Sequence, residues 1–246
     1  MRAAVITDIH ANLPALEAVL AAIDKAGTDE IWCLGDVVGY GAQPDGCAEL
    51  VKQRCDVCLV GNHDLAVLGD LDISSFSSAA ADAVTWTQAN AGPETFEFLR
   101  GLQPVGERES VGLFHASPRD PVWEYVLSIE QAQECLKMQP QRVALIGHSH
   151  VALYFSGPAA GEDGDVRGIQ AGDGAGLDLG EGRWLVNPGS VGQPRDGDPR
   201  AAWLELETGD WSASYHRVDY EIERAATPIA EAGLPRHLAD RLYLGQ

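Results

Sequence analysis

The stretch RAAVITDIHANLPALEAVLAAIDKA, residues 2–26, contains the pattern that decides the fold. Residues 3–7 form a short apolar run that is typical of a buried strand, and polar residues follow it from Asp8 onward. The spacing of apolar residues then predicts a helix over 13–26, with Asn12 as its N-cap and Pro14 in the first turn. A strand that runs into a polar loop and then a helix is the first half of a βαβ unit.

The same alternation continues through the first two thirds of the chain. Further short apolar runs predict strands at 30–34, 57–60, 111–115 and 143–146, and helical spacing predicts helices at 45–54, 76–90, 94–101 and 128–138. This rhythm indicates a mostly parallel sheet that is covered on both faces.

The last third of the chain has a different pattern. It predicts turns and a loop around short strands over 157–182, alternating strands at 183–187, 201–207 and 211–218, and terminal helices over 221–241. No repeat and no long polar linker divides the sequence. We therefore expect one domain, residues 1–246, with two packed sheets.

Composition excludes several classes of protein. The 246 residues include 17 Lys and Arg against 37 Asp and Glu, a net charge of −20. This charge argues against a protein that coats nucleic acid or lies on a membrane surface, since both need a basic face. No apolar run approaches the ~20 residues of a membrane span. The odd count of five cysteines argues against a disulfide framework, so we expect a cytoplasmic protein, and the sequence leaves its oligomeric state open.

Side chains that bind metal ions follow five of the predicted strands. In chain order they are Asp8, His10, Asp36, Asn62, His115, His148 and His150. Because ligands bind beyond the carboxyl ends of strands in open α/β sheets, we expect these side chains to lie together. Oxygen and imidazole donors without thiolate suit Mn, Fe, Zn, Co or Ni. Seven donors are too many for one ion and suit two ions that share a carboxylate, the usual arrangement for phosphate-ester hydrolysis.

The order of these motifs resembles the calcineurin-like metallophosphoesterase superfamily. The matching pieces are Asp8-x-His10, Gly35-Asp36, Gly61-Asn62-His63-Asp64, His115 and Gly147-His148-x-His150. The stretches Asp8-Ile9-His10-Ala11-Asn12 and Asn187-Pro188-Gly189-Ser190 resemble its small bacterial phosphodiesterase branch. The resemblance implies an α/β fold, a four-layer α/β/β/α sandwich of two mixed sheets flanked by helices.

The resemblance also implies a hydrolase with a dinuclear metal site, for which we expect two divalent transition-metal ions, manganese first and Fe, Zn, Co or Ni as alternatives. The first ion would be held by Asp8, His10, Asp36 and His150. Asp36 would bridge to a second ion held by Asn62, His115 and His148. A metal-bridging hydroxide would attack phosphorus while His63, the implied catalytic residue, protonates the leaving oxygen or stabilises its charge.

Two positions depart from the protein-phosphatase branch. Gly39 stands where that branch has an acid that orients the motif histidine, and no arginine follows Asn62-His63-Asp64 before Arg100. We therefore favour a small phosphodiester or nucleotide-type substrate over a phosphoprotein. The alternatives are a phosphomonoesterase or protein phosphatase, a dinucleoside-polyphosphate hydrolase and, less favoured because every ligand is retained, a non-catalytic metal-binding scaffold.

Three residues are candidates for substrate binding. Arg119 and Arg195 each lie in a Pro-Arg-Asp triplet, where the guanidinium could grip a phosphate oxygen or pair with a neighbouring Asp or loop carbonyl. Asn12 could reach the phosphate, although the role of helix cap is favoured. The sequence does not identify the residue that orients His63, and Asp64 is a poor candidate because neighbouring side chains diverge.

Overall fold

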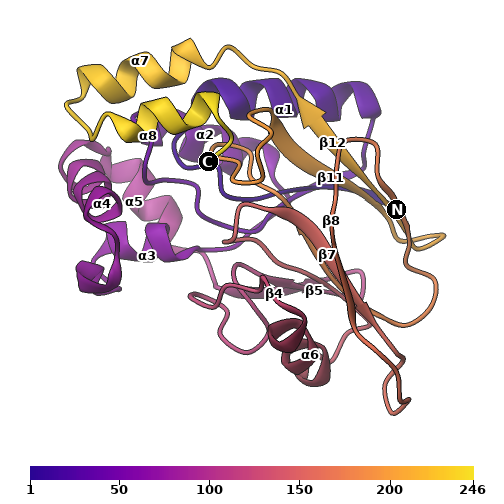
Figure 1. Cartoon of the computed structure of the whole chain (residues 1–246). Helices are drawn as coiled ribbons and strands as arrows, with labels where there is room; N and C mark the ends of the chain where they lie inside the picture. Colours follow the sequence, from indigo (N-terminus) through magenta and orange to yellow (C-terminus); the bar gives the residue numbers. More distant parts are fainter.

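The first of two six-stranded sheets has the order β3-β2-β1-β11-β12-β9 (Figure 1). The structure is a computed structural model that describes residues 1–246. The strands are β1 (Arg2–Ile6), β2 (Glu30–Cys33), β3 (Val57–Cys58), β9 (Gly176–Asp178), β11 (Ala201–Glu207) and β12 (Ser212–Val218). Strand β1 pairs parallel with β2 and antiparallel with β11, so the sheet is mixed.

The second sheet has the order β4-β5-β6-β10-β7-β8. Its strands are β4 (Val105–Arg108), β5 (Val111–Phe114), β6 (Val143–Leu145), β7 (Ala152–Gly157), β8 (Arg167–Gln170) and β10 (Arg183–Pro188). The central strands β5, β6 and β10 run parallel, and the outer pairs are antiparallel.

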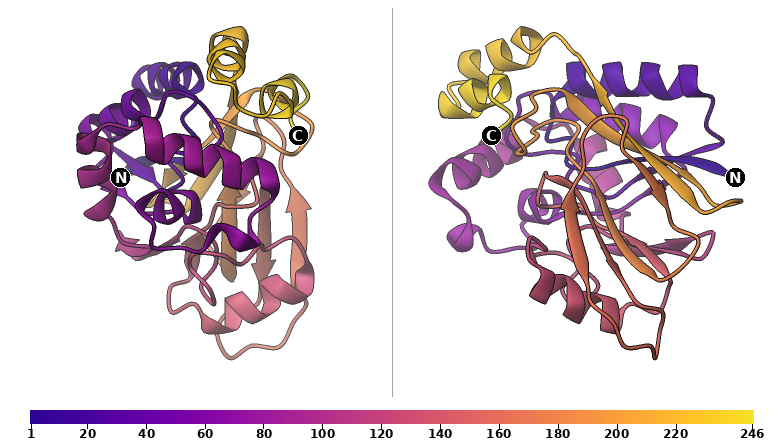
Figure 2. Two further views of the ribbon diagram at one scale, coloured as in Figure 1. Left: turned by 90° about the vertical axis from the view of Figure 1, so that its left-hand side faces the viewer. Right: turned by 45° about the vertical axis from the view of Figure 1, so that its right-hand side comes forward.

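Helices cover the outer face of each sheet (Figure 2). The helices are α1 (Leu13–Ala26), α2 (Pro44–Arg54), α3 (Asn62–Leu68), α4 (Ser78–Asn90), α5 (Pro93–Arg100), α6 (Ile129–Met138), α7 (Glu223–Glu231) and α8 (His237–Asp240), with short 3-10 turns η1 (Ile73–Ser75) and η2 (Arg241–Tyr243). Helix α6 packs alone on the second sheet, and α1 and α2 pack on the first. No helix combines the length and the apolar character needed to cross a bilayer.

The alternation of side chains along β1 explains the four layers. Ala4 and Ile6 face the helices, whereas Ala3 and Val5 face the core between the two sheets, because successive strand residues point to opposite faces. All four side chains are fully buried. The predicted four-layer α/β/β/α sandwich of two mixed sheets is therefore confirmed.

The structure differs from the sequence prediction in local detail. The predicted mostly parallel sheet is mixed, because the strands of the last third join both sheets. Strand β8 is exposed along its whole length and β4 nearly so, which removes the apolar signal that would reveal them. Helix α3 begins at Asn62, where the polar run predicts only a loop.

Candidate metal centre

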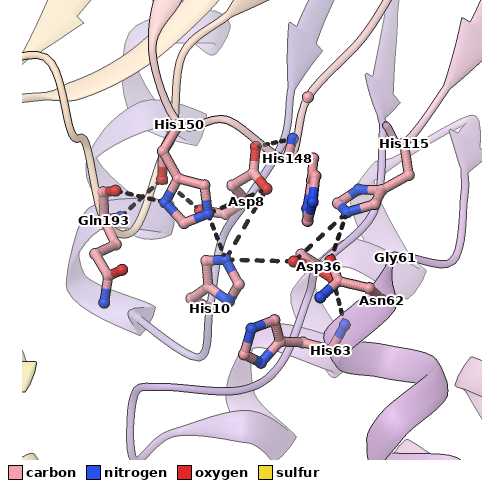
Figure 3. Close-up of polar contacts among 12 residues, drawn as sticks. Asp8, His10, Asp36, Gly61, Asn62, His63, His115, His148, His150 and Gln193 are labelled. Atoms are coloured by element: carbon pink, nitrogen blue, oxygen red, sulfur yellow. Dashed lines mark hydrogen bonds and ion pairs between the residues drawn. The ribbon is translucent and has the colours of Figure 1, made fainter. Parts of the chain in front are cut away.

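The metal-binding side chains come together at the carboxyl ends of strands from both sheets (Figure 3). Asp8 and His10 follow β1, and Asp36 follows β2. Asn62 and His63 form the first turn of α3. The remaining histidines follow the second sheet's parallel strands: His115 follows β5, and His148 and His150 follow β6. Strand ends that are distant in the sequence thus bring these side chains together in one cluster.

The first donor group consists of Asp8, His10, Asp36 and His150. One donor atom from each lies within 4.8 Å of the other three. The Nε2 atoms of His10 and His150 are 3.0 Å apart. His10 Nε2 lies 3.5 Å from Asp36 Oδ2, and His150 Nε2 lies 3.5 Å from Asp8 Oδ1. All four side chains are buried, so these donors converge on one small volume.

The second donor group consists of Asp36, His115 and His148, with Asn62 beside them. His115 Nε2 lies 3.6 Å from Asp36 Oδ2 and 3.1 Å from Asn62 Oδ1. The carboxylate of Asp36 therefore belongs to both groups. A carboxylate that belongs to two donor groups is suited to hold two neighbouring cations.

Main-chain carbonyl groups determine which ring nitrogen each histidine offers. The Nδ1 atoms of His10, His115 and His150 lie 3.2, 3.0 and 2.7 Å from the carbonyl oxygens of Val38, Leu34 and Gln193, respectively. A carbonyl only accepts, so each Nδ1 carries the proton and donates it. The lone pair then sits on Nε2, which faces the donor groups. Hydrogen bonds of this kind commonly orient metal-binding histidines.

Several buried donor atoms have no hydrogen-bond partner. They are Asp8 Oδ1, Asp36 Oδ2 and His148 Nε2. A buried polar atom without a partner costs about 1–3 kcal/mol, so three together need an explanation. Divalent cations at the two donor groups would satisfy all of them. The residues present therefore fit two ions of the Mn, Fe, Zn, Co and Ni class.

Burial also alters the acidity of these groups. It raises the pKa of Asp8 to about 7 and raises that of Asp36 well above its ordinary range. It lowers the pKa of His10, His148 and His150 well below the ordinary value. The imidazoles are thus neutral, as metal ligands must be, and the carboxylates are destabilised in the absence of a nearby positive charge.

The backbone at the donor residues is strained. Asp8, His10, Asp36, His148 and His150 have φ values between 49° and 62°, in the left-handed region that residues other than glycine rarely adopt. Each such residue costs about 1–3 kcal/mol. Backbone hydrogen bonds hold the conformation, for example from the Asp8 and His10 N–H groups to the carbonyls of Gly35 and Asp36. Strain held this firmly is typical of functional sites.

Glycine is required where two site loops touch. A Cβ atom on Gly61 would lie 2.1 Å from Asp36 Oδ1, and one on Gly147 would lie 2.3 Å from Thr7 Oγ1. Both distances are shorter than any contact between nonbonded atoms. The glycines beside the donor residues in the sequence therefore let these loops approach each other.

The side chain of Asp64 ties two loops together and does not orient His63. Its carboxylate accepts hydrogen bonds from the N–H groups of Gly61, Val37 and Val38 at 3.0–3.2 Å. These bonds join the start of α3 to the loop that carries Asp36. The expectation that Asp64 is a poor partner for His63 agrees with this arrangement.

Aromatic packing surrounds His63 instead. Its ring centroid lies 4.3 Å from that of Tyr40 and 5.1 Å from that of Phe76. Its Nδ1 is buried without a partner, and a Cβ atom on Gly39 would lie 2.5 Å from it. The ring is therefore held by tilted and edge-to-face aromatic contacts, with no carboxylate behind it. Burial, followed by the charges of Arg195 and His115, lowers the pKa of His63 well below its ordinary value.

A cleft of about 640 Å³ opens beside the donor groups. Asn62, His63 and His148 line it together with aromatic and cationic residues from five other segments. Those residues include Tyr40, Phe76, Trp123, Tyr125, Arg195 and Arg241. A substrate can therefore reach the donor groups from solvent through this cleft.

The three candidate substrate-binding residues lie in different surroundings. The guanidinium of Arg119 forms an ion pair with Glu124, which matches the structural interpretation of this residue rather than phosphate binding. Asn12 caps α1 by accepting from Ala15 N–H at 3.2 Å, and it donates to the carbonyl of Gly192 at 2.8 Å. Arg195 alone of the three lines the cleft, where it donates to Gln193 Oε1 at 2.8 Å.

Two residues of the cleft carried no signal in the sequence. Phe76 lies between the 3-10 turn η1 and α4, and Arg241 begins the last 3-10 turn, so neither belongs to a metal-binding motif. A residue pattern indicates local structure, whereas these side chains reach the cleft only through the packing of helices. The absence of an arginine soon after His63 in the sequence therefore does not mean that the cleft lacks one.

Known proteins resemble this chain over the region that carries the donor residues. The profile of the calcineurin-like phosphoesterase superfamily domain matches residues 1–209. An uncharacterized protein of Methanocaldococcus jannaschii is 37% identical over 249 residues, which cover 99% of this chain and 98% of that protein.

Two solved structures are also similar. The chain is similar to a metallophosphoesterase from Sphaerobacter thermophilus, with a TM-score of 0.89, 39% identity and coverage of 100% and 99% of the two chains. A hypothetical protein from Pyrococcus horikoshii has a TM-score of 0.79 at 18% identity, with coverage of 100% and 98%. The second similarity concerns the fold alone.

Proposed function

Because the chain belongs to the calcineurin-like phosphoesterase superfamily, we propose that it hydrolyses a phosphodiester or nucleotide-type ester with the help of two divalent metal ions. The observation that carries this proposal is the sharing of Asp36 between two buried donor groups that open into one cleft. The family consists of metal-dependent phosphoric ester hydrolases, which sets the reaction class. The substrate is our inference from the cleft.

In this proposal the first ion is held by Asp8, His10, Asp36 and His150, and the second by Asp36, Asn62, His115 and His148. When bound, two such cations supply Lewis acidity, which makes a water molecule more acidic and neutralises charge on the phosphate. The carbonyls behind the histidines hold the rings in place, so the site needs little rearrangement. Hydrolysis adds one water across a P–O bond and releases an alcohol and a phosphorylated product.

His63 is the proposed catalytic residue. Its Nδ1 is buried and has no acceptor within reach, so the proton is better placed on Nε2, the atom left to face the cleft. From there the ring can donate to the leaving oxygen as negative charge develops. Arg195 lies in the same cleft and is the proposed ligand of a nonbridging phosphate oxygen.

The preference for a diester has a physical basis. A phosphodiester carries an ester group on both sides of phosphorus, and a cleft of about 640 Å³ has room for both. His63 has no carboxylate partner and burial lowers its pKa, so it adds no positive charge that would favour the doubly charged monoester. We therefore expect higher kcat/KM on an aryl phosphodiester than on the monoester of the same phenol.

The experiment compares bis(4-nitrophenyl) phosphate with 4-nitrophenyl phosphate after reconstitution with Mn, Zn, Fe, Co or Ni. Faster turnover of the diester at the same metal and pH supports the proposal. A reversed preference supports the phosphomonoesterase or protein-phosphatase alternative. Hydrolysis of neither compound with any of the metals would leave the non-catalytic scaffold.

The proposal also includes the native metal, the cellular location and the domain organisation. Manganese is the first metal we propose, because the carboxylates of Asp8 and Asp36 suit Mn, whereas the imidazoles suit Fe, Zn and Ni as alternatives. All five cysteines are free thiols, the state that a reducing cytoplasm maintains. We also propose that residues 1–246 act as one domain, since the two sheets share a continuous apolar core.

A further inference from the structure

A ring of aromatic side chains surrounds the entrance to the candidate metal centre. Taken in order, the ring centroids are 4.3 Å apart from Tyr40 to His63, 5.1 Å from His63 to Phe76 and 5.0 Å from Phe76 to Trp123. The series continues with 6.0 Å from Trp123 to His148 and 4.0 Å from His148 to Tyr125. The entrance is therefore lined by flat, polarisable faces.

Arg195 closes this ring. Its guanidinium carbon lies 5.5 Å from the centre of the Tyr40 ring, and its charge also acts on the Tyr125 hydroxyl. Along the ring, Arg195 is separated from Phe76 and Trp123 by Tyr40 and His63 on one side and by Tyr125 and His148 on the other. Arg195 thus lies on one side of the ring and Phe76 and Trp123 lie on the other. His63 and His148, which border the donor groups, lie between the two sides.

Arg241 adds a second cation to the same cleft. Its position is fixed by buried neighbours, since Leu238 and Leu242 pack with Ala79 and Ala83 of α4. The Nε group of Arg241 donates to the main-chain carbonyl of Gln246. Both guanidinium groups line one cleft, and burial, followed by the charge of Arg195, lowers the pKa of Arg241.

These two arginines differ from most others in the chain because neither forms an ion pair with an Asp or Glu side chain, the Nε group of Arg241 being bonded to the main-chain oxygen of Gln246. The guanidinium groups paired with carboxylates are those of Arg2, Arg54, Arg108, Arg119, Arg200, Arg217, Arg224 and Arg236. In a chain of net charge −20, two neighbouring arginines without such partners form a local site for an anion. One phosphate at the metal centre does not need both.

We propose that the substrate extends across the metal centre, with a planar aromatic group on Phe76 and Trp123 and a second phosphate group on Arg241, beside the phosphate that Arg195 contacts. The substrate class is therefore a nucleotide ester that carries a phosphate in addition to the one that is hydrolysed. This inference rests on the proposed phosphoesterase activity. The cleft volume of about 640 Å³ lies in the range of about 300–1,000 Å³ that small organic ligands occupy.

Arg241 is the residue on which the test is based. It lines the cleft from outside residues 1–209, the part of the chain that matches the family profile. Bidentate contact of an arginine with phosphate is worth about ten-fold or more in affinity.

The experiment uses two substrates that differ only in the second phosphate: thymidine 5′-(4-nitrophenyl phosphate) and its 3′-phosphorylated form. For the Mn-loaded protein we expect KM to be about ten-fold lower for the phosphorylated form. Arg241→Gln should bring the ratio of the two KM values close to one, and Arg241→Lys should restore part of it. Arg236→Gln is the matched control, since Arg236 is an exposed arginine near the end of the chain and does not line the cleft.

The aromatic side is tested with Trp123→Leu. This variant should weaken competitive inhibition by AMP about ten-fold while changing inhibition by ribose 5-phosphate less than three-fold, because loss of base stacking costs about 1–3 kcal/mol. Thermal unfolding followed by circular dichroism checks that each variant is folded.

Equal KM values for the two thymidine esters in the unmodified protein would overturn the second-phosphate site while leaving the phosphoesterase proposal intact. The same would follow if Arg241→Gln preserved the KM ratio. Equal losses for AMP and ribose 5-phosphate in Trp123→Leu would overturn the aromatic site. Hydrolysis of neither ester would instead contradict the proposed function itself.

Discussion

The metal centre and the rim of the cleft are built in opposite ways. The metal centre, consisting of the donor residues of the two groups and Asn62, lies on loops that directly follow strands and is held by main-chain hydrogen bonds. The cleft rim, consisting of Tyr40, Phe76, Trp123, Tyr125, Arg195 and Arg241, is held mainly by side-chain packing. We infer that the first determines the chemistry and that the second determines the substrate.

The largest effect is expected when the shared carboxylate of Asp36 is removed from the metal centre. Asp36→Asn should lower the occupancy of both metal sites and reduce kcat by about 10⁴-fold, because one carboxylate serves both donor groups and metal activation is worth several kcal/mol. Elemental analysis of the reconstituted protein measures the occupancy. Asp24→Asn, a surface change, is the control. One tightly bound ion that survives Asp36→Asn would contradict a dinuclear site.

The next change acts at the border of the two regions. His63→Ala should leave metal content near that of the unmodified protein and reduce kcat by about 10²–10⁴, the usual contribution of a positioned proton donor. The loss should be larger for an alkyl or nucleoside leaving group than for 4-nitrophenolate, which needs little protonation. If metal content falls together with activity, His63 is a ligand and our assignment of the second site is wrong.

A smaller effect is expected from Gly39→Ala. The added methyl group would lie 2.5 Å from His63 Nδ1, and Gly39 has a φ of 92° that other residues adopt poorly. We expect the His63 ring to move and kcat to fall about 10- to 100-fold, because displacement of about 1 Å has such effects. Metal content should be retained. Wild-type kcat in this variant would mean that the position of His63 does not matter.

The smallest effect sharpens the distinction between structure and binding. Asn12→Ala should lower the free energy of unfolding by about 1–2 kcal/mol, because it removes the cap of α1 and the bond to Gly192. KM for a phosphodiester should change less than two-fold. Denaturant unfolding and steady-state kinetics on the same preparation separate the two quantities. A large rise in KM at unchanged stability would instead mean that Asn12 binds the substrate phosphate.

The same contrast explains what the sequence could predict. The metal-binding residues stand within a few positions of short apolar runs, so locating the strands also places the ligands at one edge. Strand direction accounts for the clustering within each sheet, and the packing of the two sheets brings the two sets of residues together. The helical start at Asn62 was missed because α3 has few apolar residues before its C-terminal half.

The cleft rim was harder to predict for a physical reason. Arg241 reaches the cleft because α8 and η2 pack on α4, and such contacts between distant helices leave no periodic trace around the arginine itself. The sequence around Tyr40 and Trp123 gives no means to choose between a packing role and a place in the cleft wall. Arg119 and Arg195 stand in identical triplets, yet Glu124 neutralises the first while the second has no carboxylate partner.

Gln193 connects the two regions. Its main-chain carbonyl accepts the hydrogen bond of His150, and its side-chain oxygen accepts from Arg195. An anion that draws Arg195 toward it therefore acts on the residue that orients a proposed metal ligand. Binding at the two places should be cooperative, and thermodynamic linkage requires the effect to be mutual. Phosphate should raise the affinity for Mn²⁺ by the same factor by which Mn²⁺ raises the affinity for phosphate. The protein would then retain its metals most firmly while it holds substrate or product.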